Sequence, residues 1–338
     1  MIIDSHDTDQ KVFIIAEIGS NHEGNFTLAE ELIGLAAEAG ADAVKFQTIV
    51  PERLISPKEK DRLTQLRKFQ LSDSEFESLS RTARQEGVLF LSTPFDIESA
   101  RFLNSLVPAF KIASGDNDFY PLLSFVVRLG KPILLSTGFL TMPEIIEIRR
   151  FVSKVYSADQ LKSKMAFLHC VSSYPTLPHD ANLLAIQSLL SLDLTIGYSD
   201  HTLGIEAPLL AVALGARVIE KHFTKDKNYS DFRDHCLSAD PKEMKDLVQR
   251  IREVEILLGD GVKKMEEGEK GNLLKMRRSA TAIRDLPAGR LLTREDIAWL
   301  RPGGGIPPKD EEKLLGRALR QPIARGEKIA LNDLQESF

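Results

Sequence analysis

Two histidines stand at the ends of neighbouring apolar stretches, where their imidazoles could act on a substrate. His201 lies near the end of TIGYSDHT (195–202), and His222 near the end of VIEKHFT (218–224). If the two stretches are adjacent strands of one parallel sheet, both imidazoles emerge at the same edge. Two neutral nitrogen ligands with open positions around them would hold a divalent metal ready for a substrate. The alternative is that each histidine makes only a hydrogen bond at its strand end.

Two lysines, Lys45 and Lys111, interrupt otherwise apolar stretches. A buried ammonium group is costly without an anionic partner, so these lysines predict a site for phosphate and carboxylate groups. Hydroxyl side chains at the ends of the same kind of stretch would complete the site: Ser92, Thr93, Ser114, Ser136, Ser172 and Ser199. Glu17 lies in the first apolar stretch, where burial would raise its pKa and suit it to general acid or base chemistry. An internal ion pair between Glu17 and a lysine is an equally good interpretation.

These polar residues fall at the ends of short β-rich stretches that alternate with amphipathic, helix-length segments. The eight stretches are 12–20, 43–48, 89–95, 109–114, 132–138, 164–172, 194–202 and 217–224. Alternating strands and helices predict a parallel sheet covered by helices, and eight regular units favour a closed (β/α)8 TIM barrel. Catalytic residues of such barrels lie at the carboxyl ends of the strands. A doubly wound open sheet is the alternative, but no glycine-rich nucleotide motif follows the first strand.

The composition changes after the last of these units. We expect a barrel domain over 1–258, a linker over 259–277 that is rich in Gly, Lys and Glu, and a small unit over 278–338. Short apolar segments in the small unit are separated by turn signals such as LPAG and RPGGG. A unit of this size has little core of its own, so we expect it to dock on something larger.

Composition argues against several classes of protein. The formal net charge of −5 gives no electrostatic case for a nucleic-acid or anionic-membrane partner. Cys170 and Cys236 are too few for a disulfide framework and fit a reducing cytosol. The polar N-terminus is unlike a signal peptide, and no apolar run approaches the roughly 20 residues of a membrane span. We therefore expect a cytoplasmic protein that acts on small molecules.

Several stretches, taken together, resemble one family. They are AEIGSNHEGN (16–25), GADAVKFQT (40–48), LSTPFD (91–96), FKIASGDNDFYPLL (110–123), KPILLSTG (131–138), HCVSSYPT (169–176), GYSDHTLG (197–204) and EKHFT (220–224), followed by RSATAIRDLPAGRLLTREDI and LRPGGGI. In this order they resemble the sialic acid synthases, which include N-acetylneuraminate, legionaminate and pseudaminate synthases. The last two stretches resemble the C-terminal antifreeze-like SAF domain of these enzymes. The resemblance extends over essentially the whole chain.

The resemblance implies a transferase that condenses phosphoenolpyruvate with an open-chain N-acetylhexosamine. The acceptor would be N-acetylmannosamine or a 2,4-diacetamido relative, and the products a nonulosonic (sialic-type) acid and phosphate. A metal would polarise the sugar aldehyde, which the methylene carbon of phosphoenolpyruvate attacks. Water, activated with the help of Glu17, would capture the resulting cation at C2, and the tetrahedral intermediate would lose phosphate through C–O cleavage.

The resemblance also implies roles for particular residues. Glu17, Lys45 and Lys111 match the catalytic set, and phosphoenolpyruvate-binding positions are matched by Lys45, Thr93, Lys111, Ser114, Ser136, Ser172 and Ser199. Positions facing the sugar are matched by Gln47, Asp116, Tyr174 and Asp234. His201 and His222 match the ligands of a Mn²⁺ or Mg²⁺ ion. Arg301 matches an arginine that the SAF domain of a partner subunit inserts into the site, which implies a domain-swapped homodimer.

Some features depart from the family pattern, and some alternatives stay open. Asp116 and Ser172 stand where some members carry Glu and Asn. The loop 225–238 lacks the Pro-Gly that often precedes the Asp-His pair, so Asp231 competes with Asp234 for the position beside the sugar. A second possible enzyme is a synthase that makes 3-deoxy sugar acids from phosphorylated sugars. An alternative outside the enzymes is a non-catalytic sugar-binding protein. The phosphorylation state of the acceptor and the identity of the metal also stay open.

Overall fold

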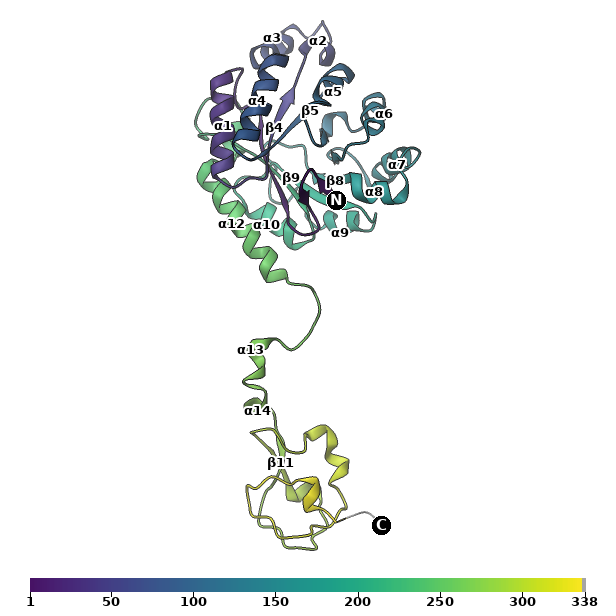
Figure 1. The fold of residues 1–338 in the computed structure, drawn as a ribbon, viewed down its shortest axis with the longest axis vertical. Coiled ribbons are helices and arrows are strands. Elements are labelled where there is room, and N and C mark those ends of the chain that lie inside the picture. The colour runs from purple at the N-terminus through teal and green to yellow at the C-terminus, as the bar shows by residue number, and fades with distance from the viewer. Residues whose placement is uncertain (336–338) are drawn as a thin grey trace. The chain divides into compact units, whose positions relative to one another are not determined.

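The computed structural model describes residues 1–335 and divides into two compact units (Figure 1). The first unit is Met1–Gly259, and the second begins at Asp260. No helix within the described residues is long and apolar enough to cross a membrane.

The first unit is built on a sheet of eight parallel strands in the order β5–β4–β3–β10–β9–β8–β7–β6. The strands are β3 (Phe13–Gly19), β4 (Ala43–Thr48), β5 (Leu89–Pro94), β6 (Phe110–Ile112), β7 (Ile133–Ser136), β8 (Met165–Cys170), β9 (Thr195–Asp200) and β10 (Val218–His222). The first strand of the series pairs with the last, from Phe13↔Val218 to Glu17↔His222. In the described chain β5 and β6 lie side by side without a hydrogen-bonded ladder, so the barrel is nearly closed. This pairing confirms the predicted TIM barrel and excludes the open sheet.

Helices follow the strands and cover the outside of the barrel (Figure 1). They are α1 (Phe26–Glu38), α2 (Pro51–Leu54), α3 (Lys60–Phe69), α4 (Asp73–Gln85), α5 (Ile97–Leu103), α6 (Tyr120–Leu129), α7 (Met142–Val152), α8 (Ala158–Lys164), α9 (Ala185–Leu190), α10 (Glu206–Ala213), α11 (Asp234–Leu237) and α12 (Pro241–Leu258). Local sequence sets several of their ends. Ser72 and Glu75 form a capping box at the start of α4, and Asp96 accepts two backbone hydrogen bonds at the start of α5.

Alternation along the strands explains why the polar site lies inside the barrel. Ile14, Ala16 and Ile18 of β3 point outward into the helix layer, so Phe13, Ile15 and Glu17 point inward. The same alternation, with a period of two residues, places a set of apolar side chains inside the barrel toward its amino-terminal end: Ala43, Leu91, Ala109, Leu134, Ala166, Leu168 and Val218. Two residues after the apolar residue of β4, β5, β6, β7 and β10, the inward position is polar: Lys45, Thr93, Lys111, Ser136 and Glu220. The inward face of these strands thus changes from apolar to polar toward the carboxyl end.

A short antiparallel hairpin precedes the barrel and was not predicted from the sequence. It consists of β1 (Ile2–Ile3) and β2 (His6–Asp7). Met1 and Ile3 are buried and pack with the inward apolar side chains of the barrel strands. The hairpin therefore closes the amino-terminal end of the barrel.

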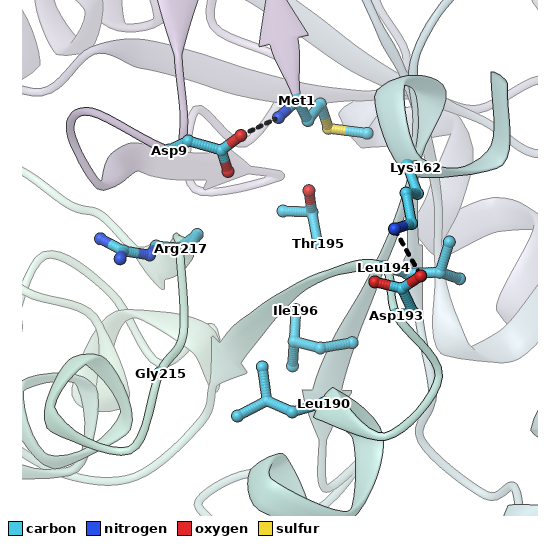
Figure 2. Close-up of a pocket in the computed structure, with 10 residues that line it drawn as sticks. All are labelled: Met1, Asp9, Lys162, Leu190, Asp193, Leu194, Thr195, Ile196, Gly215 and Arg217. Carbon is cyan, nitrogen blue, oxygen red and sulfur yellow. Dashed lines mark ion pairs between the residues drawn. The ribbon is translucent and has the colours of Figure 1, made fainter. Parts of the chain in front are cut away.

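A pocket of about 460 Å³ opens beside this hairpin (Figure 2). Its lining includes Thr195 and Ile196 at the start of β9, and Arg217 just before β10. The only ion pairs drawn across it join Met1 to Asp9 and Lys162 to Asp193. The pocket lies at the amino ends of the strands and contains none of the predicted site residues.

The second unit has its own small core. It contains α13 (Glu267–Lys270), α14 (Leu273–Met276), β11 (Ser279–Ala282) and β12 (Ile297–Leu300), with 3₁₀ turns at Arg294–Asp296, Pro308–Lys313 and Leu331–Asp333. The two strands pair antiparallel, from Ser279↔Leu300 to Ala282↔Ile297. Asp296 is fully buried and binds the guanidinium groups of Arg284 and Arg290.

Candidate active site

The carboxyl ends of the barrel strands bring together most of the residues that the sequence singled out. Side chains on the inward face are buried there: Glu17, Lys45, Thr93, Lys111, Ser136, Ser199, Glu220 and His222. His201, directly after β9, is buried beside them. The two histidines come from paired parallel strands, as the sequence predicted, because β9 and β10 pair through Asp200↔Lys221.

An ion pair between Glu17 and Lys45 lies at the centre of this group. Lys45 Nζ is 2.7 Å from Glu17 Oε2 and donates a hydrogen bond to Thr93 Oγ1 at 3.2 Å. Gln47 Nε2 donates to the other carboxylate oxygen of Glu17 at 3.2 Å. Burial raises the pKa of Glu17 to about 7, because desolvation and the nearby Glu220 outweigh the attraction of Lys45. The sequence offered an ion pair with a lysine and a raised pKa as alternatives for Glu17. Glu17 has both.

Glu220 is a residue of this site that the sequence analysis did not select. Its Oε1 lies 3.8 Å from Lys45 Nζ and 3.6 Å from Lys111 Nζ, and it accepts a hydrogen bond from Ser199 Oγ at 3.0 Å. Strand alternation is the signal that identifies it, because Glu220 shares the inward face of β10 with His222.

Three serine hydroxyls gather around the end of β7. Gly138 N donates to Ser114 Oγ at 3.1 Å, and a Cβ on Gly138 would lie 2.3 Å from Ser172 Oγ. Only glycine at position 138 therefore lets these hydroxyls approach, a role that the sequence analysis missed. The Oγ atoms of Ser136 and Ser172 are buried, and neither has a hydrogen-bond partner within residues 1–335. Buried donors without partners, next to the strand of Lys111, fit a bound anion.

The two histidine rings face each other. Their centroids are 5.3 Å apart, and the ring of Tyr174 lies 4.1 Å from that of His201. His201 Nδ1 is 2.8 Å from the carbonyl oxygen of Val171, which can only accept, so Nδ1 carries the proton and Nε2 has a free lone pair. Burial lowers the pKa of His201, but its contacts with Cys170 and the Val171 carbonyl, together with the charge of Glu220, raise that pKa above its ordinary value. Desolvation and the charge of His201 hold the pKa of His222 well below its ordinary value.

This pair of rings fits a divalent cation held by two imidazoles. The buried Nδ1 of His222 has no hydrogen-bond partner in the described chain, as expected for a nitrogen reserved for another ligand. Among residues 1–335, no group of three or more His, Cys, Asp or Glu side chains converges as a metal site. A cation at the two histidines would therefore take its other ligands from water and substrate, as in open catalytic sites.

A cavity of about 750 Å³ opens next to the histidines. It is lined by Ser20, Glu23, Gln47, Ile49, Leu54, Arg62, Gln65, Leu66, Lys68, Phe69, Phe95, Tyr174, His222, Asp231, Phe232, Arg233 and Asp234. Three of the four residues predicted to face the sugar therefore share one cavity. The fourth, Asp116, lies in the turn Ser114–Asp116 after β6 and is absent from this lining. Burial, followed by the charge of Asp118, raises the pKa of Asp116 to about 6.

The loop before α11 brings both candidate aspartates to this cavity. Asp234 is buried, whereas Asp231 is exposed at the rim. Arg233 Nε lies 3.1 Å from Asp234 Oδ1, and its guanidinium stacks 4.8 Å from the centroid of the Tyr174 ring. Phe232 packs on Phe69 at the end of α3, with ring centroids 5.0 Å apart. The 51–70 segment thus forms two helices and one wall of the cavity.

Arg301 belongs to the second unit. It follows β12, at the start of the RPGGG turn, and its side chain is exposed. Lys328 Nζ donates to the carbonyl oxygen of Gly303 at 2.6 Å, and this bond fixes the turn against the small core.

A second buried ion pair lies directly behind the histidines. Lys221 Nζ is 2.7 Å from Asp200 Oδ2, and both side chains are fully buried. Asp200 Oδ1 accepts from the hydroxyl of Tyr198 at 2.9 Å and from the backbone N–H of Thr202 at 2.9 Å. These bonds hold the end of β9, which carries His201, against β10.

We expect Asp200→Asn to destabilise the protein strongly. Removing one partner leaves the Lys221 charge buried and uncompensated, which costs about 3–5 kcal/mol. Urea unfolding of the purified variant measures this cost. Asp193→Asn, which breaks an exposed pair with Lys162, is the matched control and should cost less than about 1 kcal/mol. Equal losses for the two variants would contradict a structural role for the buried pair.

The fold and this group of residues together define the class: a TIM-barrel protein with a polar, buried site at the carboxyl ends of its strands. Residues 32–263 match the NeuB family, and residues 277–335 match the SAF domain. The chain belongs to the NeuB family, which confirms the resemblance seen in the sequence.

Individual relatives agree with this assignment. The chain is 41% identical to the N,N'-diacetyllegionaminic acid synthase of Legionella pneumophila over 93% of its length and 92% of the relative. It is 36% identical to the pseudaminic acid synthase of Campylobacter jejuni over 99% of its length and 100% of that protein. The crystal structure of an N-acetylneuraminic acid (sialic acid) synthetase from Leptospira borgpetersenii in complex with citrate superposes with a TM-score of 0.73 at 39% identity. This match covers 78% of the chain and 90% of that structure.

Proposed function

We propose that this chain condenses phosphoenolpyruvate with an open-chain N-acetylhexosamine to give a nonulosonic acid and phosphate. The acceptor is N-acetylmannosamine or a 2,4-diacetamido relative, and the enzyme is a transferase of the N-acetylneuraminate synthase type. One observation carries the proposal: two buried lysines and unpartnered serine hydroxyls share the barrel end with two facing histidines and a carboxylate. The relatives described above support it through the activities that their names state.

The site residues bind phosphoenolpyruvate and take part in the proton transfers. Lys45 and Lys111, with Thr93 and the serine hydroxyls of positions 114, 136, 172 and 199, bind the carboxylate and phosphate of phosphoenolpyruvate. The enol double bond supplies the electron pair for a new bond between the methylene carbon and the aldehyde carbon, whose oxygen becomes a hydroxyl. Water adds to the cationic C2, and Glu17 accepts one of its protons, which ends on the former aldehyde oxygen; the second proton leaves with the phosphate. The C2–O bond to phosphate then breaks, which releases inorganic phosphate and leaves a keto acid.

The remaining residues hold the acceptor and a metal. Gln47, Tyr174 and Asp234 face the sugar in the cavity described above. His201 and His222 hold a Mn²⁺ or Mg²⁺ ion, which when bound polarises a carbonyl oxygen and acidifies a water molecule.

Both cysteines are unpaired, which supports a reducing compartment such as the cytoplasm.

A panel of acceptors tests the function. Purified enzyme with phosphoenolpyruvate and Mn²⁺ is expected to release phosphate with at least one N-acetylated hexosamine, and mass spectrometry identifies the nine-carbon product. Release only with a phosphorylated simple aldose would support a 3-deoxy sugar acid synthase instead. If no acceptor in the panel caused phosphate release in the presence of Mn²⁺, the result would favour a non-catalytic sugar-binding protein. The panel includes N-acetylmannosamine, its 6-phosphate and the 2,4-diacetamido sugars.

We further propose that the chain works as a domain-swapped homodimer in which each site receives Arg301 from the other copy. If so, a mixture of Arg301→Ala and Glu17→Gln subunits contains mixed dimers that have one intact site. With random assortment, about one quarter of the wild-type activity returns, although each variant alone is nearly inactive. The measurement is phosphate release after co-expression of two differently tagged chains. Activity no greater than the sum of the parents would show that each site uses its own arginine.

A further inference from the structure

Glu220 lies between the two lysines of the site, yet no step proposed above uses it. The residue is 5% exposed, and its Oε1 lies 3.8 Å from one ammonium group and 3.6 Å from the other. Lys45 also has Glu17 at 2.7 Å, whereas Lys111 has no carboxylate other than Glu220 within 4 Å in the described chain. Among the described residues, Glu220 therefore supplies the only carboxylate within ion-pair distance of Lys111.

The bonding of Glu220 differs from that of a structural ion pair in the same barrel. Both oxygens of Asp200 are used, by Lys221, Tyr198 and Thr202. Glu220 Oε1 accepts one hydrogen bond, from Ser199 Oγ, and its buried Oε2 has no hydrogen-bond partner within residues 1–335. Its distances to the two ammonium groups exceed hydrogen-bond length. Glu220 thus acts on both lysines at once through charge, and binds neither tightly.

We propose that Glu220 is a positioning residue that holds the ammonium groups of Lys45 and Lys111 in place for the anionic groups of phosphoenolpyruvate. The inference rests on the proposed function, because it takes phosphoenolpyruvate as the anion. Two buried ammonium groups repel each other unless a negative charge separates them. A carboxylate that bonded either lysine tightly would have to be displaced by the substrate. At its observed distance, Glu220 offsets the repulsion without itself occupying an N–H donor of either lysine.

Binding of phosphoenolpyruvate to the full-length protein, measured by isothermal titration calorimetry without acceptor, tests this role. Glu220→Gln keeps the shape and removes the charge, and we expect its Kd for phosphoenolpyruvate to rise about 10- to 100-fold. The KM for phosphoenolpyruvate should rise in parallel. The KM for the acceptor and kcat should change by less than about threefold. Glu220→Asp, which keeps the charge at a shorter reach, should lie between the two.

Two controls separate this role from a general structural one. Glu206→Gln removes an exposed carboxylate on α10 that pairs with Arg250, and should leave the Kd unchanged. In a Lys111→Met background, Glu220→Gln should weaken binding by less than about threefold, because one of the lysines that it positions is gone. Unchanged or tighter binding by a folded Glu220→Gln variant overturns the inference. If that variant does not fold, equal affinity of Glu220→Asp and wild type overturns it. Wild-type protein that does not bind phosphoenolpyruvate would instead overturn the proposed function.

Discussion

Replacing Glu17 by Gln is expected to lower kcat by about 10²- to 10⁴-fold, the usual contribution of a general base. The amide keeps the size of the side chain but cannot accept a proton from the attacking water. Because Lys45 loses its closest partner, we also expect a moderate rise in the KM for phosphoenolpyruvate. Steady-state phosphate release over a range of both substrates measures the two effects. Glu38→Gln, at an exposed position of α1, is a control that should behave as wild type.

The pH profile provides a second test of the same residue. Glu17 must be ionised to accept a proton, and its pKa in the free enzyme is about 7. The ionised fraction grows as the pH rises through this value, so kcat/KM should reach half of its plateau near pH 7 and level off about one pH unit higher. In Glu17→Gln this ascending limb should be missing. A variant that kept the wild-type limb would place the responsible ionisation on another group.

The double replacement of His201 and His222 by Ala is expected to abolish metal binding and lower activity by about 10³-fold or more. A bound metal supplies several kcal/mol of transition-state stabilisation, which corresponds to this factor. Bound Mn²⁺ is measured by electron paramagnetic resonance after gel filtration, and activity by phosphate release. We expect the melting temperature to fall only modestly, because the strands bury their own apolar core without a metal.

The control for this prediction is His179→Ala, which changes an exposed histidine outside the site. It should bind Mn²⁺ and turn over as wild type does. Wild-type enzyme treated with a chelator should lose activity and recover it when Mn²⁺ is added. Full activity of the double variant without bound metal would exclude the metal role of this pair.

Strand alternation accounts for how much of the site was predictable. The apolar runs predicted the barrel, and their polar ends predicted the gathering of Glu17, Lys45, Lys111 and the histidines. Glu220 was given no role because the sequence EKHFT holds three polar residues in succession, and only the inward register separates Glu220 from Lys221. Period-two alternation, applied from His222, would have made that distinction.

Irregular segments were predicted less well, for reasons that lie in their composition. Helix α3 has a narrow apolar stripe of Leu63, Leu66 and the partly buried Phe69 among charged residues, so its periodicity is weak. Local pattern also does not show that Phe69 meets Phe232, because these residues are far apart in the chain. The same is true of the β1–β2 hairpin, whose two-residue strands are too short for a recognisable pattern.

The hairpin at the amino-terminal end has a kinetic consequence. Met1 and Ile3 close that end of the barrel, so substrates must come and go through the opposite mouth. Lys45 and Lys111 are buried and do not line the cavity that contains Gln47, Tyr174 and Asp234. An acceptor seated at the mouth would stand in the path of the more deeply bound phosphoenolpyruvate. Because the barrel is open at one end only, we expect ordered binding, with phosphoenolpyruvate first and the sugar second.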